Sequence, residues 1–147
     1  MPSDDKSFLV LLNDAARQIR SEFGKRARDH KLSLLQWRTL GALGRNGAMT
    51  QGAIGAKIEA SPMTMSDIVT RLETLGYVTR DVDPNDSRAK LVTLTPAAGP
   101  IIDEMRALAA DLTARALTGF SEDERALMTA LLTRLTGNLE TLSSSND

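Results

Sequence analysis

Apolar residues recur at helical spacing along the first third of the chain. Over residues 6–29 they return every three or four positions with Arg and Lys between them, which predicts an amphipathic helix. A second helix is expected to begin at Leu32 and Ser33 and to end at Asn46 and Gly47. Glycine suits a left-handed C-terminal cap, so Gly47 is a natural stop.

Two further helix starts follow closely. Thr50 is placed to cap a short helix, within which Gly55 indicates close approach to a neighbouring helix. Ser61 followed by Pro62 is a strong start signal for the next helix, which Gly76 ends. A short helix, a tight turn and a longer helix form the helix-turn-helix pattern, whose second helix enters the major groove of DNA.

The period then changes from helical to alternating. Residues 77–82 and 90–94 alternate between apolar and polar side chains as strands do, and residues 83–88 between them are rich in turn formers. This stretch predicts a β-hairpin with a long tip, directly after the helix-turn-helix.

Helical spacing returns in the last third. Thr95 and Pro96 open a long helix that Gly119 breaks, and residues 121–124 form a capping box for the last helix. That helix carries a heptad seam of apolar residues, namely Met128, Leu132, Leu135, Leu139 and Leu142. A short polar tail over residues 143–147 is expected to fray. The seam exceeds what a small domain can cover, so we expect a dimer to bury it.

Composition removes several functional classes. The chain has no cysteine and a single histidine, His30, which argues against disulfides, thiolate chemistry and a metal site built from several histidines. No phosphate-binding loop or nucleophile motif is present, so we expect no catalytic residue, no cofactor and no enzymatic activity. We interpret His30 as a solvated residue at a helix end. With no signal-like or membrane-length apolar run, a cytoplasmic protein is expected.

Charge is distributed unevenly along the chain. The net charge of −1 argues at first against nucleic acid, but residues 16–47 carry eight Lys and Arg against two acidic residues, a local charge of +6. Residues 101–147 carry four arginines against eight acidic residues, a local charge of −4. The middle and N-terminal part can therefore face phosphates. Residues 50–94 carry five basic against six acidic residues, a local charge of −1, so further phosphate contacts are expected from Arg38, Arg45 or the first helix.

Residues 61–71 supply side chains suited to the major groove. Hydroxyls can bond bases or phosphates, a methionine can touch a thymine methyl, and an arginine can bind guanine or phosphate. The candidates are Ser61, Met63, Thr64, Met65, Ser66, Thr70 and Arg71. For each one the alternative stays open that the methionines belong to the core and the hydroxyls are merely solvated.

The hairpin supplies a second candidate contact. Asp83, Asp86 and Arg88 share one turn, where a carboxylate can hold a guanidinium rigid. An arginine presented in this way fits the narrow minor groove, where negative potential is concentrated. The alternative is an ion pair that only stabilises the turn. Lys90, on the second strand, joins the DNA-binding candidates.

Three motifs in a fixed order carry a resemblance to a known family. LETLGYVTR at residues 72–80, DPNDSR at 83–88 and LTP at 94–96 resemble the MarR family of bacterial transcriptional regulators, and the similarity extends over residues 6–142. The resemblance implies that Arg88 enters the minor groove with Asp86 orienting it. It also implies that Thr50 and Gln51 begin the helix-turn-helix where backbone amides meet a phosphate.

The expected fold is therefore mainly α with a small β-hairpin, a winged helix-turn-helix with N- and C-terminal dimerisation helices. The resemblance places the dimerisation region at residues 6–30 and 96–142 and the DNA-binding domain at residues 33–95.

The expected function is sequence-specific binding of double-stranded DNA by a homodimer. It would act as a repressor on an inverted repeat whose half-sites lie on the order of 10 base pairs apart. The resemblance further implies control by a small aromatic or phenolic ligand, and the residues considered for its pocket are Arg17, Arg20, Trp37 and Met105, with Trp37 otherwise a core residue. The alternative function is a protein-interaction module without DNA binding, which the near-neutral charge of residues 50–94 motivates.

Overall fold

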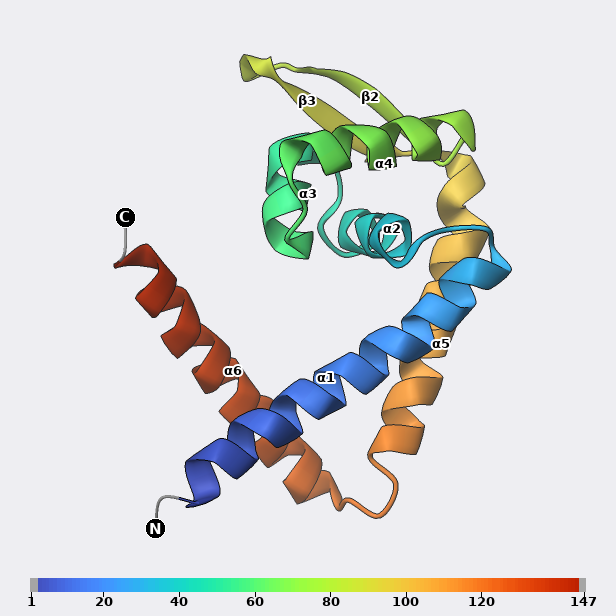
Figure 1. The fold of residues 1–147 in the computed structure, drawn as a ribbon. Helices are drawn as coiled ribbons and strands as arrows, with labels where there is room; N and C mark the ends of the chain where they lie inside the picture. The colour runs from blue at the N-terminus through green and yellow to red at the C-terminus, as the bar shows by residue number, and fades with distance from the viewer. Residues whose placement is uncertain (1–2, 146–147) are drawn as a thin grey trace. The chain divides into compact units, whose positions relative to one another are not determined.

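The computed structural model describes residues 3–145 and divides into two compact units, one extending to Met105 and the other beginning at Arg106. The first unit holds a mixed set of helices and strands (Figure 1). These are α1 (Ser3–Asp29), α2 (Leu34–Asn46), β1 (Met49–Thr50), α3 (Gln51–Ile58), α4 (Pro62–Thr74), β2 (Val78–Asp83), β3 (Asp86–Leu94), the 3-10 turn η1 (Pro96–Ala98) and the start of α5 (Gly99–Ala116).

Side-chain caps fix where the helices of this unit begin. Ser33, Thr50 and Ser61 each have extended backbone and accept a hydrogen bond from the backbone N–H three residues on, which satisfies one of the free amides of a helix start. At the end of α2, Gly47 has a positive φ of 76°. The predicted starts of α2, α3 and α4 and the predicted end of α2 are confirmed.

The strands form an antiparallel sheet in the order β1-β3-β2. The two-residue strand β1 was not predicted, because it is too short to show alternation. The expected long hairpin tip is wrong: only residues 84 and 85 lie between the strands, and β3 begins at Asp86. The backbone N–H of Asn85 donates to Asp83 Oδ1 at 2.9 Å, which lets a tight turn replace the open loop.

The core of the first unit lies where α2, α3, α4 and the sheet meet. Its largest fully buried side chains include Leu40, Leu43, Ile54, Met65 and Leu72. Figure 1 shows α4 running beside the β2–β3 hairpin, with α3 and α2 below it. The predicted fold, mainly α with a β-hairpin that forms the wing of a helix-turn-helix, is confirmed.

Gly55 allows α3 and α4 to come close. A Cβ at this position would lie 2.9 Å from Met65 Cγ and 3.0 Å from the Ala60 carbonyl oxygen, both shorter than ordinary van der Waals contact. The close approach that the sequence indicated for Gly55 is thereby confirmed, and it sets the distance between the two helices of the helix-turn-helix.

The second unit contains the rest of α5 and the helix α6 (Glu122–Ser144). Ser121 and Glu124 make the predicted capping box, in which each residue's backbone N–H donates to the other's side chain. None of the described residues of α6 is buried, and Leu132, Leu139 and Leu142 are 42%, 52% and 62% exposed.

The end of the chain differs from the prediction in one detail. The helix α6 includes Ser143 and Ser144, which were expected to belong to a frayed tail, and residues 146–147 of that tail lie outside the described residues. Within residues 3–145, no helix combines the length and the apolar character needed to cross a bilayer.

Candidate nucleic-acid interface

The N-terminal half of α4 presents a row of polar and apolar side chains to solvent. Ser61 Oγ accepts from the Thr64 backbone N–H at 3.2 Å and donates to Thr64 Oγ1 at 2.9 Å. Met63 is 79% exposed and Ser66 is exposed as well, and so is Arg71 in the last turn of α4. An uncovered methionine of this kind on the outer face of a helix is available to contact the methyl group of a thymine.

Met65 does not belong to this row. It is only 1% exposed and packs against Gly55 in the core, so it cannot reach a DNA base. The assignment of Met65 to the DNA-binding candidates was therefore wrong, and the alternative of a core methionine holds. Position explains the difference from Met63: the two residues are two apart on a helix, and so face different directions.

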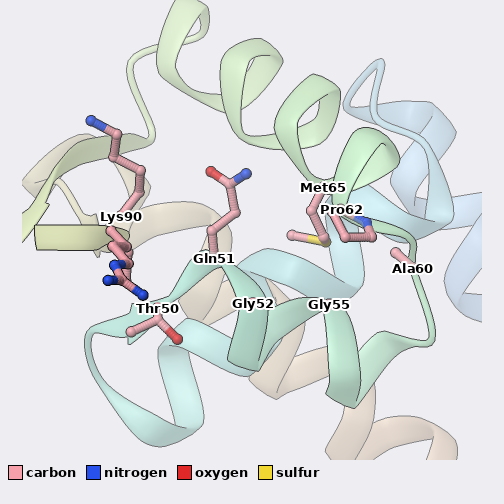
Figure 2. A pocket seen from close by; sticks show the side chains of 10 residues that line it. Thr50, Gln51, Gly52, Gly55, Ala60, Pro62, Met65 and Lys90 are labelled. Atoms are coloured by element: carbon pink, nitrogen blue, oxygen red, sulfur yellow. The ribbon is translucent and has the colours of Figure 1, made fainter. Parts of the chain in front are cut away.

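A groove of about 350 Å³ opens between the helix-turn-helix and the strand β3 of the wing. Its walls come from the start of α3, the turn before α4 and the strand β3 (Figure 2). Small residues line one part, including Gly52, Gly55 and Ala60, and Arg88 and Lys90 line another. The groove thus brings Thr50 and Gln51 together with Arg88 and Lys90, which lie far from them in the sequence, and the largely buried Met65 also lines it.

The chemistry of this groove suits an anion. Thr50 caps α3 by accepting from the Ala53 backbone N–H at 3.2 Å, while the amides of the first helical residues have no partner inside the helix. Those amides carry the positive end of the helix dipole. With Arg88 and Lys90 beside them, the groove offers both directed N–H donors and positive charge, which is what a backbone phosphate requires.

The contact between Asp86 and Arg88 runs through the backbone. Asp86 Oδ1 accepts from the Arg88 backbone N–H at 2.9 Å. Among residues 7–145, no carboxylate forms an ion pair with the Arg88 guanidinium, so the expected Asp86–Arg88 ion pair is replaced by a turn-stabilising hydrogen bond. The exposed guanidinium of Arg88 remains available to a ligand.

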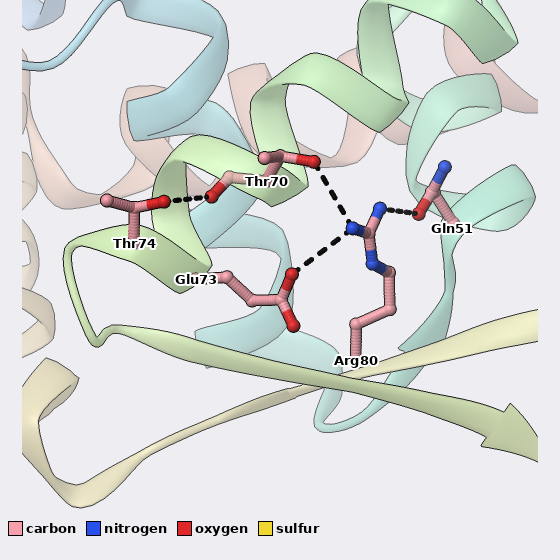
Figure 3. Close-up of polar contacts among 5 residues, drawn as sticks. All are labelled: Gln51, Thr70, Glu73, Thr74 and Arg80. Carbon is pink, nitrogen blue, oxygen red and sulfur yellow. Dashed lines mark hydrogen bonds and ion pairs between the residues drawn. The ribbon is translucent and has the colours of Figure 1, made fainter.

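Arg80 connects three elements of the interface and was given no role from the sequence. Its Nη1 donates to Gln51 Oε1 at 3.3 Å, and its Nη2 donates to Thr70 Oγ1 and to Glu73 Oε1, each at 3.2 Å (Figure 3). The strand β2 is thereby tied to α3 and α4. The only signal in the sequence was the position of Arg80 at the end of the LETLGYVTR motif, which does not say what the side chain contacts.

The two basic residues of α2 are placed differently. Arg38 is half-buried, and its Nη1 donates to the Ile58 carbonyl at 3.5 Å, where it satisfies the C-terminal end of α3. Arg45 is exposed near the end of α2. Arg45 therefore has the more accessible charge of the two.

The residues considered for a ligand pocket fall into two groups. Trp37 and Met105 are 4% and 8% exposed and belong to the core of the first unit. For Trp37 this agrees with the alternative prediction that it is a core residue. Arg17 and Arg20 are exposed on α1, and Arg17 pairs with Asp14 at 3.0 Å.

The surroundings of His30 differ from the predicted solvated position at a helix end. His30 is not a solvated residue, because its Nε2 lies 3.0 Å from Glu104 Oε2 and its ring packs on Trp37 with a centroid separation of 5.7 Å. The side chain therefore joins the end of α1 to α2 and to the first turns of α5.

Comparisons with known proteins agree with this geometry. A sequence model described as the MarR family matches residues 30–89. A solved structure of the transcriptional regulator PA3341 is 33% identical, covers 91% of this chain and 98% of its own, and superposes with a TM-score of 0.81. The HTH-type transcriptional regulator MT0903.1 of Mycobacterium tuberculosis (strain CDC 1551 / Oshkosh) is 28% identical over 97 residues, which are 66% of this chain and 68% of that protein.

A further similar structure is of BpsR from Bordetella bronchiseptica. It is 27% identical, covers 88% of this chain and 98% of its own, and has a TM-score of 0.73. The DNA binding of BpsR is regulated by 6-hydroxynicotinic acid.

Proposed function

The chain belongs to the MarR family of transcriptional regulators, and we propose that it is a sequence-specific repressor that binds double-stranded DNA as a homodimer. The observation that carries the proposal is the groove in which the start of α3 meets Arg88 and Lys90, beside the exposed N-terminal half of α4. The groove is suited to hold a phosphate, while α4 is suited to read base edges.

The proposed DNA contact of each residue is based on the exposure and position of its side chain. Ser61, Met63, Ser66 and Arg71 lie on the solvent side of α4 and are proposed to contact the major groove, together with Thr64. Thr50, Gln51, Thr70 and Lys90 are proposed to hold the phosphate backbone, which fixes the position of α4 but does not read sequence. Arg88 is proposed to enter the minor groove from the tip of the wing.

The proposed homodimer covers apolar surface that each unit leaves exposed. On α6 the exposed large apolar side chains are Leu127, Leu131, Leu132, Leu139 and Leu142; on α1 they are Phe8, Leu9, Val10, Leu11 and Ile19. Patches of this kind mark interaction sites, because monomeric soluble proteins rarely expose them. We therefore propose residues 6–30 and 96–142 as the dimerisation region and residues 33–95 as the DNA-binding domain.

Control by a small aromatic acid is proposed as a further property. The support is the relative BpsR, which is regulated by 6-hydroxynicotinic acid, and the two exposed arginines of α1, Arg17 and Arg20, which can attract a carboxylate. Such a ligand would release DNA only if it binds the DNA-free conformation more tightly than the DNA-bound one.

One observation favours the second candidate function, a protein-interaction module without DNA binding. Residues 50–94 have a net charge of −1, and the guanidinium groups of Arg38 and Arg80 are engaged within the fold. Both features reduce the charge available for phosphates, which dominate affinity for DNA.

Selection of bound duplexes from a pool of random DNA separates the two functions. The repressor proposal predicts enrichment of an inverted repeat that the protein shifts in electrophoresis at low salt, and 6-hydroxynicotinic acid can then be added to the complex. No enrichment, together with a single stoichiometric protein partner in a pull-down, would favour the interaction module.

A further inference from the structure

Arg80 is a donor-only side chain, and this decides how its partners are oriented. A guanidinium has five N–H donors and no acceptor, so any group bonded to it must present an oxygen. The amide of Gln51 therefore turns Oε1 towards Arg80, at 3.3 Å, and its Nε2 points away (Figure 3). The hydroxyl of Thr70 likewise accepts from Arg80, at 3.2 Å, which leaves its own proton free to be donated elsewhere.

The consequence is that two flexible polar groups have become directed donors. Gln51 Nε2 makes no hydrogen bond with residues 7–145, whose side chains the structure describes, and Gln51 lines the groove beside the start of α3. Thr70 is exposed on α4. Phosphate oxygens accept hydrogen bonds only, so a side chain with its donors already turned outward is matched to them before DNA arrives.

Arg80 itself is poorly placed to serve as a phosphate ligand. Its side chain is only 23% exposed, and Glu73 Oε1 lies 3.2 Å from its Nη2. The carboxylate of Glu73 offsets the charge of the guanidinium, and three oxygens from α3 and α4 already occupy its two terminal nitrogens. The arrangement suits a side chain that acts on its neighbours rather than on DNA directly.

We propose that Arg80 is a positioning residue for DNA binding, which holds Gln51 and Thr70 as hydrogen-bond donors facing the phosphate backbone while Glu73 neutralises its own charge. This inference rests on the proposed DNA-binding function. In this proposal Arg80 does not touch DNA. It makes its two neighbours specific for groups that only accept hydrogen bonds, such as phosphate oxygens.

The test is a double-mutant cycle on the full-length protein, with the duplex that the wild type selects from random DNA as the probe. Arg80→Met keeps the aliphatic stem and removes the guanidinium, and it is expected to weaken binding roughly tenfold, the worth of one to two hydrogen bonds. In a Gln51→Ala, Thr70→Val background the same change is expected to weaken binding less than about twofold, because the groups that Arg80 positions are gone.

Two controls separate positioning from charge and from folding. Arg80→Lys keeps the positive charge but loses the planar fork that reaches three oxygens, and it is expected to weaken binding nearly as much as Arg80→Met. Gln51→Met fills similar space without donors, and it is expected to weaken binding even if Arg80→Met fails to fold. Urea unfolding of each variant establishes which of them are folded.

The dependence of affinity on salt distinguishes the proposal from a direct phosphate contact. A residue that neutralises one phosphate contributes about 0.9 to the slope of log affinity against log salt. Positioning predicts that Arg80→Met leaves this slope unchanged. A slope reduced by about 0.9, a full tenfold loss in the Gln51→Ala, Thr70→Val background, or wild-type affinity of Arg80→Met or Gln51→Met would each overturn the inference. If the wild type selects no duplex at all, the proposed function itself fails.

Discussion

The separation of α3 and α4 depends on the missing side chain at Gly55, and a methyl group tests that directly. In Gly55→Ala the new Cβ would meet Met65 Cγ at 2.9 Å and the Ala60 carbonyl oxygen at 3.0 Å. Met65 is 1% exposed, so its side chain has little room to yield. Overpacking of this kind costs about 1–3 kcal/mol, while alanine gains about 1 kcal/mol over glycine in a helix interior.

Gly52 provides the matched control. It lies in the same helix, but a Cβ there would meet nothing within 4 Å, so Gly52→Ala carries the helix-propensity gain without the clash. If the gain is similar at both positions, it cancels in the comparison. Gly55→Ala should then be less stable than Gly52→Ala by the overpacking cost alone, about 1–3 kcal/mol.

Urea unfolding followed by tryptophan fluorescence measures this difference. Trp37 is the only tryptophan and is buried in the same unit as both glycines, so it reports their unfolding. With a urea slope of about 2 kcal/mol per molar, the two midpoints should differ by on the order of 1 M. Equal midpoints with equal slopes would show that the close contact of α3 with α4 is not made.

Three further predictions follow from other parts of the molecule. Leu139→Asp should convert the proposed dimer to monomers in sedimentation, because the charge falls on the exposed apolar seam of α6, whereas Asn138→Asp next to it should not. The Ser121 backbone N–H, and secondly its side chain, lower the pKa of Glu124 in the fold. The hydrogen bond from Ser121 to the ionised Glu124 carboxylate therefore stabilises the protein above the unfolded-state pKa of Glu124. This stabilisation is lost as the pH falls through the folded-state pKa, so Glu124→Gln should make urea midpoints less dependent on pH in the acidic range. Gly52→Ala should lower affinity for DNA several-fold in fluorescence anisotropy without loss of stability, because its methyl group would stand in the groove.

Local signals in the sequence were sufficient for most of the fold. Ser33, Thr50 and Ser61 marked helix starts because a capping side chain acts within three residues of its own position. The alternation of residues 77–82 and 90–94 identified the wing, because alternation along a strand is also a local pattern. The length of the hairpin tip was missed because turn formers from 83 to 88 suit both a loop and a tight turn, and the ladder between β2 and β3 decides between them.

The features that the sequence did not reveal depend on distant residues meeting. Arg80 contacts Gln51, which is 29 positions away, and no periodicity records such a pair. Met63 and Met65 are chemically identical, and only the packing of α4 on α3 shows that one is in the core. His30 looked solvated among charged neighbours because Glu104, its partner, lies in α5.

Hydroxyl-radical footprints of the wild type and of Arg88→Ala on the selected duplex test directly whether the groove and the wing bind DNA. For the wild type we expect two protected half-sites about 10 base pairs apart. For Arg88→Ala we expect the loss of minor-groove protection where the wings reach, with a salt slope lower by about 0.9 for each phosphate contact that is lost. A wild-type protein that protects no site, or an Arg88→Ala footprint and affinity identical to those of the wild type, would contradict the claim that this groove and wing bind DNA.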